Sequence, residues 1–504
     1  MTGRIASPAF AAKLTDADTA ASFIQPGATI GASGFTGSGY PKALPAALAA
    51  RASAAHANGD TFTVSWFTGA STAPDCDGVL AAADGIALRA PYQSDPTMRA
   101  KINDGTALYA DVHLSHMHTQ IAAGFFGQLD WAIIEVAAIT KDGQLIPSSA
   151  VGMNRTYLER ASKVIIEVNH WQTEQLFGLH DIYYGTEADP PNRTPIPLLS
   201  PGGIIGQPTL NVDPAKVVAV VETCQHDRNA PFTPPDASSD AIAAHLLDFL
   251  RHEVKAGRLP TQLPPLQSGV GNIANAVLVG LLTSGLQGLT GFTEVIQDGL
   301  VDLLDAGLMT VASATAFSLS PDYADKMNQN AANYRGKIVL RPQDISNSPE
   351  VIRHLGVITC NGMIEADIYG NVNSTHVAGQ RIQNGIGGSG DFTRNAGISC
   401  FVSPSTAKNG AISTIVPMVS HVDHTEHDVA IIITEQGLAD LRGLAPRQRV
   451  PRIIDNCAHP DYRPLLHDYY DRALAVTKGR HTPHDLTTAL SWHQRLLETG
   501  TMAP

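Results

Sequence analysis

The chain has 504 residues, of which 43% are hydrophobic, and a net charge of -13 at pH 7. This length suits two or three domains with sizeable cores. The acidic balance argues against a nucleic-acid-binding protein, which would concentrate basic residues on one face.

The cysteines and apolar runs bear on the compartment. The five cysteines are scattered, with no CxxC pair for zinc or redox chemistry. The N-terminus MTGRIASPAFAAKL lacks a basic segment followed by an apolar one. No apolar run reaches the roughly 18 residues that a membrane span needs. We therefore predict a cytoplasmic protein with no membrane partner.

Short apolar runs rich in β-branched residues alternate with helical patterns along the chain. The runs predict strands buried on both faces: WAIIEVAAI (131–139), KVIIEVN (163–169), KVVAVVETC (216–224), KIVLRP (337–342) and DVAIIITE (428–435). The helical patterns are PKALPAALAARA (41–52), SDAIAAHLLDFLRHEV (239–254) and DGLVDLLDAG (298–307). This alternation predicts the α/β class, with mainly parallel sheets flanked by helices.

A weak internal repeat divides the chain into two halves. DVHLS (111–115), followed by AIIEVAAITKDG, is similar to DISNS (344–348), followed by NGMIEADIYG. Between the halves lies a proline-rich region, from HDRNAPFTPPDASSD to GRLPTQLPPLQSG, that disfavours both strands and helix interiors. We predict two tandem related domains, residues 1–225 and 226–504, with the ligand bound in a cleft formed mainly by the second.

Several glycine-rich motifs follow one another in order. They are GFTGSGYPKALPAAL (34–48), GVGNIANA (269–276), GFTEVIQDG (291–299), GIGGSGDFTRNAG (385–397) and TEQGLADLRG (434–443). Together they resemble the acetyl-CoA hydrolase/transferase family of class I CoA-transferases. The resemblance implies acyl-CoA and small carboxylates as substrates, no permanently bound cofactor, no metal and a homodimer.

Glu294 in GFTEVIQDG is the predicted nucleophile. We expect it at a glycine-rich turn that enters an amphipathic helix, where a carboxylate ordinarily offsets the helix dipole. The resemblance implies instead that Glu294 attacks an acyl-CoA carbonyl and passes through an acyl-glutamyl anhydride and a glutamyl-CoA thioester. The implied reaction moves CoA from succinyl-CoA to acetate.

The glycine clusters at 269–271 and 385–388 permit backbone N–H groups to approach a developing oxyanion. Each cluster on its own is typical of an ordinary tight turn. The resemblance assigns the amides of Val270 and Gly388 to one oxyanion hole. It assigns the side-chain amide of Asn347 to the other, although an Asn before Ser-Pro is also typical of a turn.

The resemblance also implies a CoA-binding set. The segment 269–273 would bind phosphates through backbone donors, and Lys408 would add a compact positive charge, although a loop lysine is usually only solvated. The complete set is Gly269, Val270, Gly271, Asn272, Ile273, Ile364, Asn384, Gly388 and Lys408.

Two charged residues complete the predicted site. Glu435 follows the run DVAIIIT, at the strand end where α/β sheets collect ligands, with a helix cap as the alternative. Arg228 lies in QHDRNAP at the predicted domain boundary. The resemblance places an arginine here near the active site, and both substrate contact and domain linkage stay open for it.

Two motifs invite other interpretations. GASGFTGSGYP lacks the GxGxxG spacing of a dinucleotide site. In SHVDHTEHD, His421, His424 and His427 recur at intervals of three, whereas two metal ligands on one helix face are spaced by four. We therefore predict no metal, and for these histidines either a structural role or contact with residues that themselves line the site.

Three activities are compatible with these residues. The first is the CoA-transferase, and the second is a hydrolase in which water intercepts either covalent intermediate. The third is a non-catalytic acyl-CoA sensor, since a fold does not fix a function. The presence of a nucleophile at Glu294 argues against the sensor.

Overall fold

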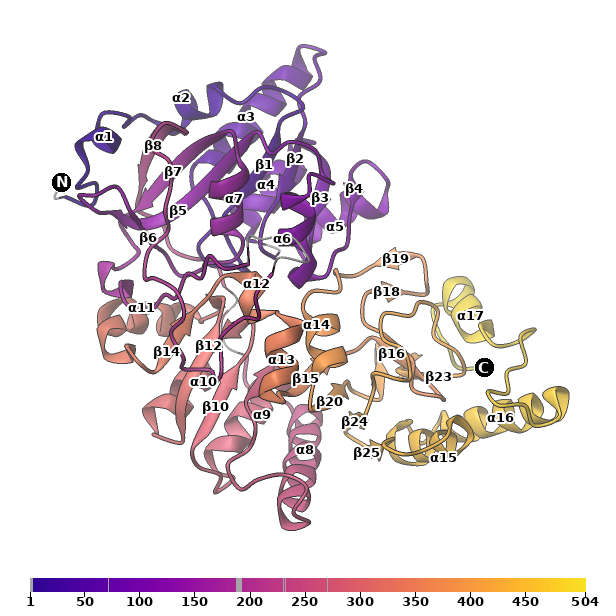
Figure 1. The fold of residues 1–504 in the computed structure, drawn as a ribbon. Coiled ribbons are helices and arrows are strands. Elements are labelled where there is room, and N and C mark those ends of the chain that lie inside the picture. The colour runs from indigo at the N-terminus through magenta and orange to yellow at the C-terminus, as the bar shows by residue number, and fades with distance from the viewer. Residues whose placement is uncertain (1–2, 71, 187–192, 230, 232, 270) are drawn as a thin grey trace. The chain divides into compact units, whose positions relative to one another are not determined.

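A computed structural model of the chain describes residues 3–70, 72–186, 193–229, 231, 233–269 and 271–504 (Figure 1). It divides into two compact units, each built from segments that are distant along the chain. Unit 1 comprises Met1–Phe232, Gly291–Leu304 and Thr310–Leu355, and unit 2 comprises Thr233–Thr290, Asp305–Met309 and Gly356–Pro504. The domain boundary after residue 225 stays a prediction, because a division in space need not follow one along the chain.

Unit 1 contains a mainly parallel sheet with the strand order β4-β3-β2-β1-β5-β7-β8, and only β6 runs antiparallel, beside β5 (Figure 1). Every residue of β5 is buried, as the apolar run at 131–139 predicted. The strands are β1 (Thr29–Ala32), β2 (Val64–Phe67), β3 (Ile86–Ala90), β4 (Leu108–Tyr109), β5 (Trp131–Ile139), β6 (Leu145–Pro147), β7 (Lys163–Asn169) and β8 (Val217–Thr223).

Helices pack on this sheet. The predicted helix in PKALPAALAARA is α3 (Leu44–Ala57), which shares one core with β1 and β2. From α7 (Asn154–Arg160), Tyr157 packs so close to Gly31 of β1 that a Cβ added there would lie 2.5 Å from the ring. The other helices of residues 3–232 are α1 (Pro8–Ala11), α2 (Ala17–Ser22), η1 (Pro74–Gly78), α4 (Val79–Ala82), α5 (Pro96–Asn103), α6 (Leu114–Ala122) and η2 (Glu174–Leu176).

The later segments of unit 1 add two parallel strand pairs, β11 with β13 and β12 with β14. Strands β10 and β12 and helix α10 each cross the division between the units. The elements are β10 (Leu289–Phe292), β11 (Val295–Ile296), α10 (Asp298–Asp305), β12 (Met309–Ala314), β13 (Ala316–Phe317), α11 (Pro321–Asn330), η3 (Ala331–Tyr334), β14 (Ile338–Leu340), α12 (Gln343–Ser346) and α13 (Pro349–Leu355).

Unit 2 contains the strand series β9-β15-β20-β24-β25, parallel except for the last pair. The predicted helix at 239–254 is α8, whose N-cap Asp236 accepts a hydrogen bond from the backbone of Ser239. The elements are α8 (Ala237–Lys255), β9 (Leu266–Ser268), α9 (Asn272–Leu282), β15 (Ile358–Gly362), α14 (Ser389–Asn395), β20 (Ile398–Val402), β24 (Ile431–Thr434) and β25 (Gly437–Asp440).

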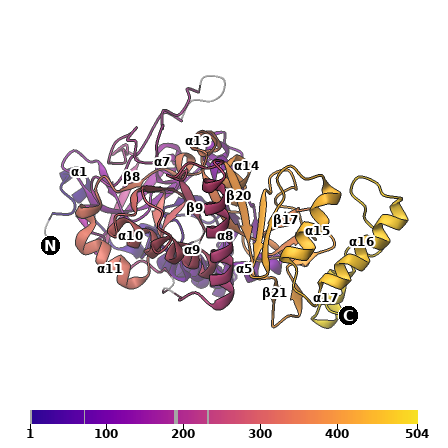
Figure 2. The same cartoon turned by 90° about the horizontal axis from the view of Figure 1, so that it is seen from below.

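Three small sheets and three C-terminal helices complete unit 2 (Figure 2). The helices share a core with β16, β17 and β23. The elements are β16 (Glu365–Asp367), β17 (Val372–Asn373), β18 (His376–Val377), β19 (Arg381–Ile382), β21 (Thr406–Ala407), β22 (Ile412–Ser413), β23 (Ile415–Val416), α15 (Pro446–Cys457), α16 (Arg463–Thr477) and α17 (Ser491–Thr499).

The predicted fold class is confirmed, because both units contain mainly parallel strands accompanied by helices. All five apolar runs contain strands, β5, β7, β8, β14 and β24. Within the described residues, no helix combines the length and the apolar character that crossing a membrane requires.

Candidate active site

Glu294 lies between two strands, so the predicted helix start at this position is wrong. It follows β10 and precedes β11, and α10 begins only at Asp298. The pairing of β11 with β13 intervenes. The carbonyl of Glu294 accepts hydrogen bonds from the backbone N–H groups of Thr315 (2.9 Å) and Ala316 (3.3 Å). These bonds hold the backbone of Glu294 and do not involve its carboxylate.

The half-buried Glu294 side chain belongs to an apolar part of unit 1. Its neighbour Val295 packs in a cluster with Phe35, Ala70, Leu114, Ala150 and Ala316, and Tyr92 lies against that cluster. Burial raises the pKa of Glu294 to about 7, and one side-chain hydrogen bond opposes the increase only in part. At neutral pH this carboxylate is therefore both ionisable and poorly solvated, as suits a nucleophile.

Asn347 supplies that hydrogen bond. Its Nδ2 donates to Oε1 of Glu294 at 3.0 Å, and the residue is fully buried. The orientation of the amide follows from Glu294, because an ionised carboxylate only accepts hydrogen bonds, and Oδ1 is then placed 2.9 Å from the Ser346 hydroxyl. The structure thus brings two predicted site residues together, and Asn347 already donates a hydrogen bond to a carboxylate oxygen of Glu294.

Helix α12, which ends just before Asn347, is anchored by buried polar contacts. Gln343 donates its backbone N–H to Gly152 O at 2.9 Å and its side chain to Leu114 O at 2.8 Å. Arg155 donates to Asp344 at 3.0 Å. Burial raises the pKa of Asp344, but the charge of Arg155 and other contacts outweigh it and hold the pKa below its usual value. Asn347 is therefore presented from a rigid support.

Tyr92 is a neighbour that the sequence analysis did not identify. Burial first, and then the charge of Glu294, raise the pKa of Tyr92 to about 12. Its phenol therefore stays protonated at neutral pH beside the carboxylate. Tyr92 lies in the loop between β3 and α5, in the stretch PYQSDP, where no catalytic motif marks it.

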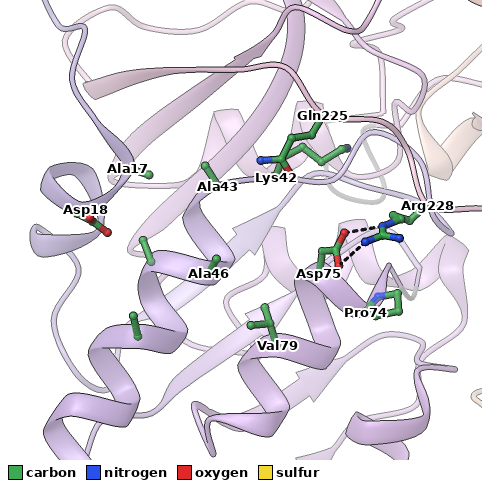
Figure 3. Close-up of a pocket in the computed structure, with 12 residues that line it drawn as sticks. Ala17, Asp18, Lys42, Ala43, Ala46, Pro74, Asp75, Val79, Gln225 and Arg228 are labelled. Carbon is green, nitrogen blue, oxygen red and sulfur yellow. Dashed lines mark hydrogen bonds and ion pairs between the residues drawn. The ribbon is translucent and has the colours of Figure 1, made fainter.

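Arg228 lines a pocket of about 670 Å³ in unit 1 (Figure 3). Its Nε donates to Asp75 Oδ2 at 2.8 Å and its Nη2 to Asp75 Oδ1 at 3.4 Å. The Arg228 side chain is 63% exposed, so this ion pair is weak. The other walls include Lys42, Gln225, Pro74 and the alanines of α3. The role of Arg228 toward substrate stays a prediction.

The loop that carries Arg228 is pinned by a buried lysine that sequence reasoning missed. Lys42 Nζ lies 2.9 Å from Glu135 and 3.0 Å from Asp227, with all three side chains at most 5% exposed. Burial lowers the pKa of Lys42, but the two carboxylates outweigh it and raise the pKa above its usual value. Asp227 also accepts from the backbone of Gly39 at 3.1 Å. Gly39 and Lys42 of GSGYPK therefore hold the segment that carries Asp227 and Arg228.

In unit 2, the predicted phosphate-binding segment opens a helix. Gly269 follows β9, and Asn272 and Ile273 begin α9. Gly271 precedes α9 with φ of 109°, a conformation that favours glycine. Val270 lies outside the described residues. An eleven-residue helix entered by a glycine turn suits anion binding, and the role of the segment stays a prediction.

The remaining predicted CoA-binding residues lie in three connections of unit 2, with Asn384 and Gly388 in the same one. Asn384 donates its side chain to Ser374 O (3.1 Å) and Gly385 O (2.9 Å), and Gly388 is the N-cap of α14. The backbone N–H of Ile364 donates to Asn373 O at 2.9 Å. Lys408 is exposed in the hairpin between β21 and β22, with φ of 49°. None of these contacts tests CoA binding, so the assignments stay predictions.

Glu435 ends a strand, as predicted, and enters a hairpin rather than a helix. It follows β24, and β25 begins at Gly437, so the alternative of a helix cap is wrong. It accepts hydrogen bonds from the backbone and the hydroxyl of Ser405, the former at 2.7 Å, and from Gln436 at 3.0 Å. Burial raises the pKa of Glu435, but these hydrogen bonds outweigh it and lower the pKa.

The three histidines of SHVDHTEHD have different surroundings. His424 is buried, His421 pairs with Asp423 at 3.2 Å, and His427 is exposed. Among the described residues, no group of three or more His, Cys, Asp and Glu side chains has an arrangement that could hold a metal ion.

The architecture is that of CoA-transferase-like proteins. Solved structures with this fold include RipA from Yersinia pestis (TM-score 0.71, 23% identity, 92% of this chain and 98% of that chain). Another is a 4-hydroxybutyrate CoA-transferase from Porphyromonas gingivalis (TM-score 0.62, 21% identity, 92% and 98%). At these identities the likeness concerns the fold alone.

The sequence comparisons define the family. Residues 4–222 match the acetyl-CoA hydrolase/transferase N-terminal domain, and residues 324–470 match the C-terminal domain of the same name. The chain is 49% identical to a succinyl-CoA:acetate CoA-transferase of Clostridium kluyveri, over 97% of this chain and 90% of that protein. The chain therefore belongs to the acetyl-CoA hydrolase/transferase family, as the motifs predicted.

Other relatives carry different activity names. A propanoyl-CoA:succinate CoA transferase of Escherichia coli is 45% identical, over 96% of this chain and 98% of that protein. An acetyl-CoA hydrolase of Saccharomyces cerevisiae is also 45% identical, over 94% and 92%. The family thus establishes an enzyme that acts on acyl-CoA thioesters.

Proposed function

We propose that the protein is a CoA-transferase that moves CoA from succinyl-CoA to acetate through Glu294. One observation carries the proposal: a carboxylate with a pKa raised to about 7 receives a side-chain amide hydrogen bond at 3.0 Å in an apolar part of the protein. The sequence likeness to a succinyl-CoA:acetate CoA-transferase supports this substrate pair.

The first half of the reaction charges the enzyme. A Glu294 oxygen attacks the succinyl-CoA carbonyl, the C–S bond breaks, and CoA leaves as a thiolate from an acyl-glutamyl anhydride. The thiolate then attacks the glutamyl carbonyl and releases succinate, leaving a glutamyl-CoA thioester. Each bond that forms replaces one that breaks, and no proton is gained or lost.

The second half runs the same steps with acetate. An acetate oxygen attacks the glutamyl-CoA carbonyl and expels CoA thiolate, and the thiolate attacks the acetyl carbonyl of the new anhydride. Acetyl-CoA leaves, and the Glu294 carboxylate is restored. One thioester replaces another, so the chemistry requires no ATP.

Asn347 has a defined task in these steps. When the glutamyl carbonyl becomes tetrahedral, negative charge develops on a Glu294 oxygen, and Asn347 Nδ2 already donates to Oε1. Because this donor is in place before the reaction, and Asn347 Oδ1 is held by the Ser346 hydroxyl, little reorganisation is needed. The resemblance assigns the amides of Val270 and Gly388 to the oxyanion on the acyl carbonyl, and Lys408, Asn384 and Ile364 to CoA.

Hydrolysis is the second candidate function. Fungal relatives of similar identity are named acetyl-CoA hydrolases. The same residues give hydrolysis when water, rather than a carboxylate, attacks the anhydride or the glutamyl thioester. A non-catalytic sensor is disfavoured, because it needs no nucleophile of raised pKa. Cytoplasmic location remains a prediction from the sequence, and the homodimer remains an implication of the family resemblance.

A single assay separates these functions. The purified protein is incubated with succinyl-CoA, with and without acetate, and succinyl-CoA, acetyl-CoA and free CoA are quantified over time. Acetyl-CoA that forms only with acetate, at constant total thioester, supports the transferase. Free CoA that forms equally without acetate identifies a hydrolase, and absence of turnover contradicts both.

A further inference from the structure

His424 lies behind the 383–389 turn, which contains Gly388, and the proposed function does not use it. The side chain is only 3% exposed. Its backbone N–H donates to Val372 O at 3.0 Å, and its carbonyl accepts from Val372 N at 2.8 Å. The ring packs on Phe401 of β20, with centroids 4.8 Å apart. The His424 residue is thus held through its backbone by Val372, and its imidazole ring is held by packing against Phe401.

The Nε2 edge of this buried ring contacts the turn. Nε2 of His424 lies 3.1 Å from the hydroxyl of Ser389, and that hydroxyl lies 2.8 Å from the carbonyl of Ile386, to which it donates. Because the Ser389 hydroxyl has one hydrogen and donates it to Ile386, Ser389 accepts from His424, and a proton is assigned to Nε2, which also lies 3.3 Å from the Ser374 hydroxyl. Two hydrogen bonds in series therefore connect His424 to the middle of the turn.

The start of the turn is held from the same histidine-containing stretch. Asp423, which directly precedes His424, accepts the backbone N–H of Ser374 at 2.7 Å. Ser374 O in turn accepts from the Asn384 side chain at 3.1 Å, and Thr375 O accepts from Gln383 N at 2.7 Å. Neighbouring residues 423 and 424 thus restrain both ends of the 383–389 turn.

The turn needs such restraint, because three of its residues are glycines. Gly387 has φ of 59°, a conformation that favours glycine. Glycine adds no side-chain packing of its own, so the direction of the Gly388 amide depends on external contacts. A displacement of about 1 Å, caused by a change away from the chemistry, is enough to lower a rate about 100-fold.

We infer that His424 is a positioning residue that orders the 383–389 turn through Ser389 and so aims the Gly388 amide at the oxyanion. The inference rests on the proposed function, in which Gly388 is a donor. It also gives the regular histidine spacing a physical meaning that involves no metal. His424 braces the turn, His421 pairs with Asp423, and His427 faces solvent.

Two substitutions of His424 separate hydrogen bonding from packing. His424→Phe keeps a ring against Phe401 and removes the donor, and His424→Gln keeps an N–H donor and removes the ring. We expect His424→Phe to lower kcat about 10- to 100-fold, with KM for acyl-CoA changed less than about threefold. His424→Gln should restore most of the lost kcat. The exposed His427→Gln, in the same stretch, is the matched control and should match wild type.

Ser389→Ala tests the second link. If His424 acts through Ser389, the double variant His424→Phe/Ser389→Ala should lose no more kcat than the more affected single variant. Hydrogen exchange of amides in 383–392 should accelerate about tenfold in His424→Phe and stay unchanged in His427→Gln, at an unchanged Tm. Hydrogen exchange at this turn reports whether His424 orders the turn, even in a variant that has lost activity for another reason.

Three outcomes overturn the inference: full kcat and normal exchange in His424→Phe, loss in His424→Gln but not in His424→Phe, or independent multiplication of the two single effects. The proposed function is checked separately, by mass spectrometry for a CoA adduct on the peptide that contains Glu294. If wild type forms the adduct and His424→Phe behaves as wild type, only the role of His424 fails. If no adduct forms and Glu294→Gln retains exchange, the proposed function fails.

Discussion

Glu294 and Glu435 each follow a buried strand, yet their surroundings move their pKa values in opposite directions. Burial raises the pKa of Glu294 to about 7, against one side-chain donor. Glu435 is also desolvated, but donors from Ser405 and Gln436 lower its pKa. Deeper burial and fewer donors together separate a reactive carboxylate from a stably ionised one, although both follow a strand.

The largest expected effect comes from removing the reactive member of the pair. Glu294→Gln keeps the size of the side chain but removes the nucleophile, so CoA exchange should fall by at least about 10⁴-fold. The measurement is acetate-dependent formation of acetyl-CoA, with circular dichroism to verify the fold. Glu435→Gln is the matched control and should still form the CoA adduct on Glu294. More than about one per cent residual exchange in Glu294→Gln would contradict the mechanism.

The second effect concerns the single donor on Glu294. Asn347→Ala should lower kcat about 100- to 1000-fold, because the oxyanion on the glutamyl carbonyl loses its donor. The same change should raise the pKa of Glu294 further, since the hydrogen bond that opposes burial is gone. Steady-state kinetics measured from pH 5 to 9 report both effects. If Asn347→Ala has a normal kcat but a shifted pH profile, Asn347 affects only the pKa of Glu294 and does not stabilise the oxyanion.

The wild-type pH profile provides the third effect. Protonated Glu294 is not a nucleophile, so kcat/KM should fall about tenfold per pH unit below the pKa of about 7. At pH 5 the expected loss is therefore about 100-fold relative to pH 8. Acetate and succinate begin to titrate at about pH 5, so the profile is measured as kcat/KM for succinyl-CoA, with the concentration of ionised acetate held constant. A flat profile down to pH 5 would place the pKa of Glu294 near its ordinary value.

The smallest effect is on stability, and it has opposite signs at the two glutamates. The folded pKa of Glu294 exceeds the unfolded value, so wild type loses stability as pH rises from about 4.5 to 7. Glu294→Gln lacks this penalty and should be more stable by about 1 to 3 kcal/mol above pH 7. Urea unfolding at pH 5 and pH 8 measures the difference, which should be smaller at pH 5.

Glu435→Gln should behave in the opposite way. A folded pKa below the unfolded value contributes stability that is present above the unfolded pKa and disappears as pH falls through the folded pKa. The variant should be less stable by about 1 kcal/mol at pH 7 and equal to wild type in strong acid. Equal signs for the two Glu→Gln variants would refute the comparison.

The sequence was sufficient for the fold class because buried parallel strands are unusually apolar. WAIIEVAAI and DVAIIITE contain β5 and β24, and the helical patterns contain α3, α8 and α10. The helix expected directly after Glu294 was wrong, because the short pairing of β11 with β13 is non-local. Strand pairs of two residues leave no periodicity that a sequence pattern could reveal.

The candidate site was predictable only where motifs mark it. The family motifs identified Glu294 and Asn347, and the structure joins them at 3.0 Å. Tyr92 carries no motif, and the histidine spacing around His424 does not show which of the three histidines is buried against distant segments. The raised pKa of Glu294 also depends on burial, and its neighbour Val295 packs against Phe35, Leu114 and Ala150, which lie far from it along the chain. Such an environment becomes visible only once the chain is folded.

The hydrogen bonds to the backbone of Glu294 limit how far its covalently bound acyl or CoA group can move. Two N–H groups, from Thr315 and Ala316, bind the carbonyl of Glu294, so only the side-chain torsions are left to move. Under the proposed function, the acyl group and then CoA are attached to the Glu294 side chain, which is short and whose backbone is held in place. The Glu294 side chain therefore cannot move between distant binding sites. Both carboxylates and the CoA thiol must instead reach the same position beside Glu294, one after the other.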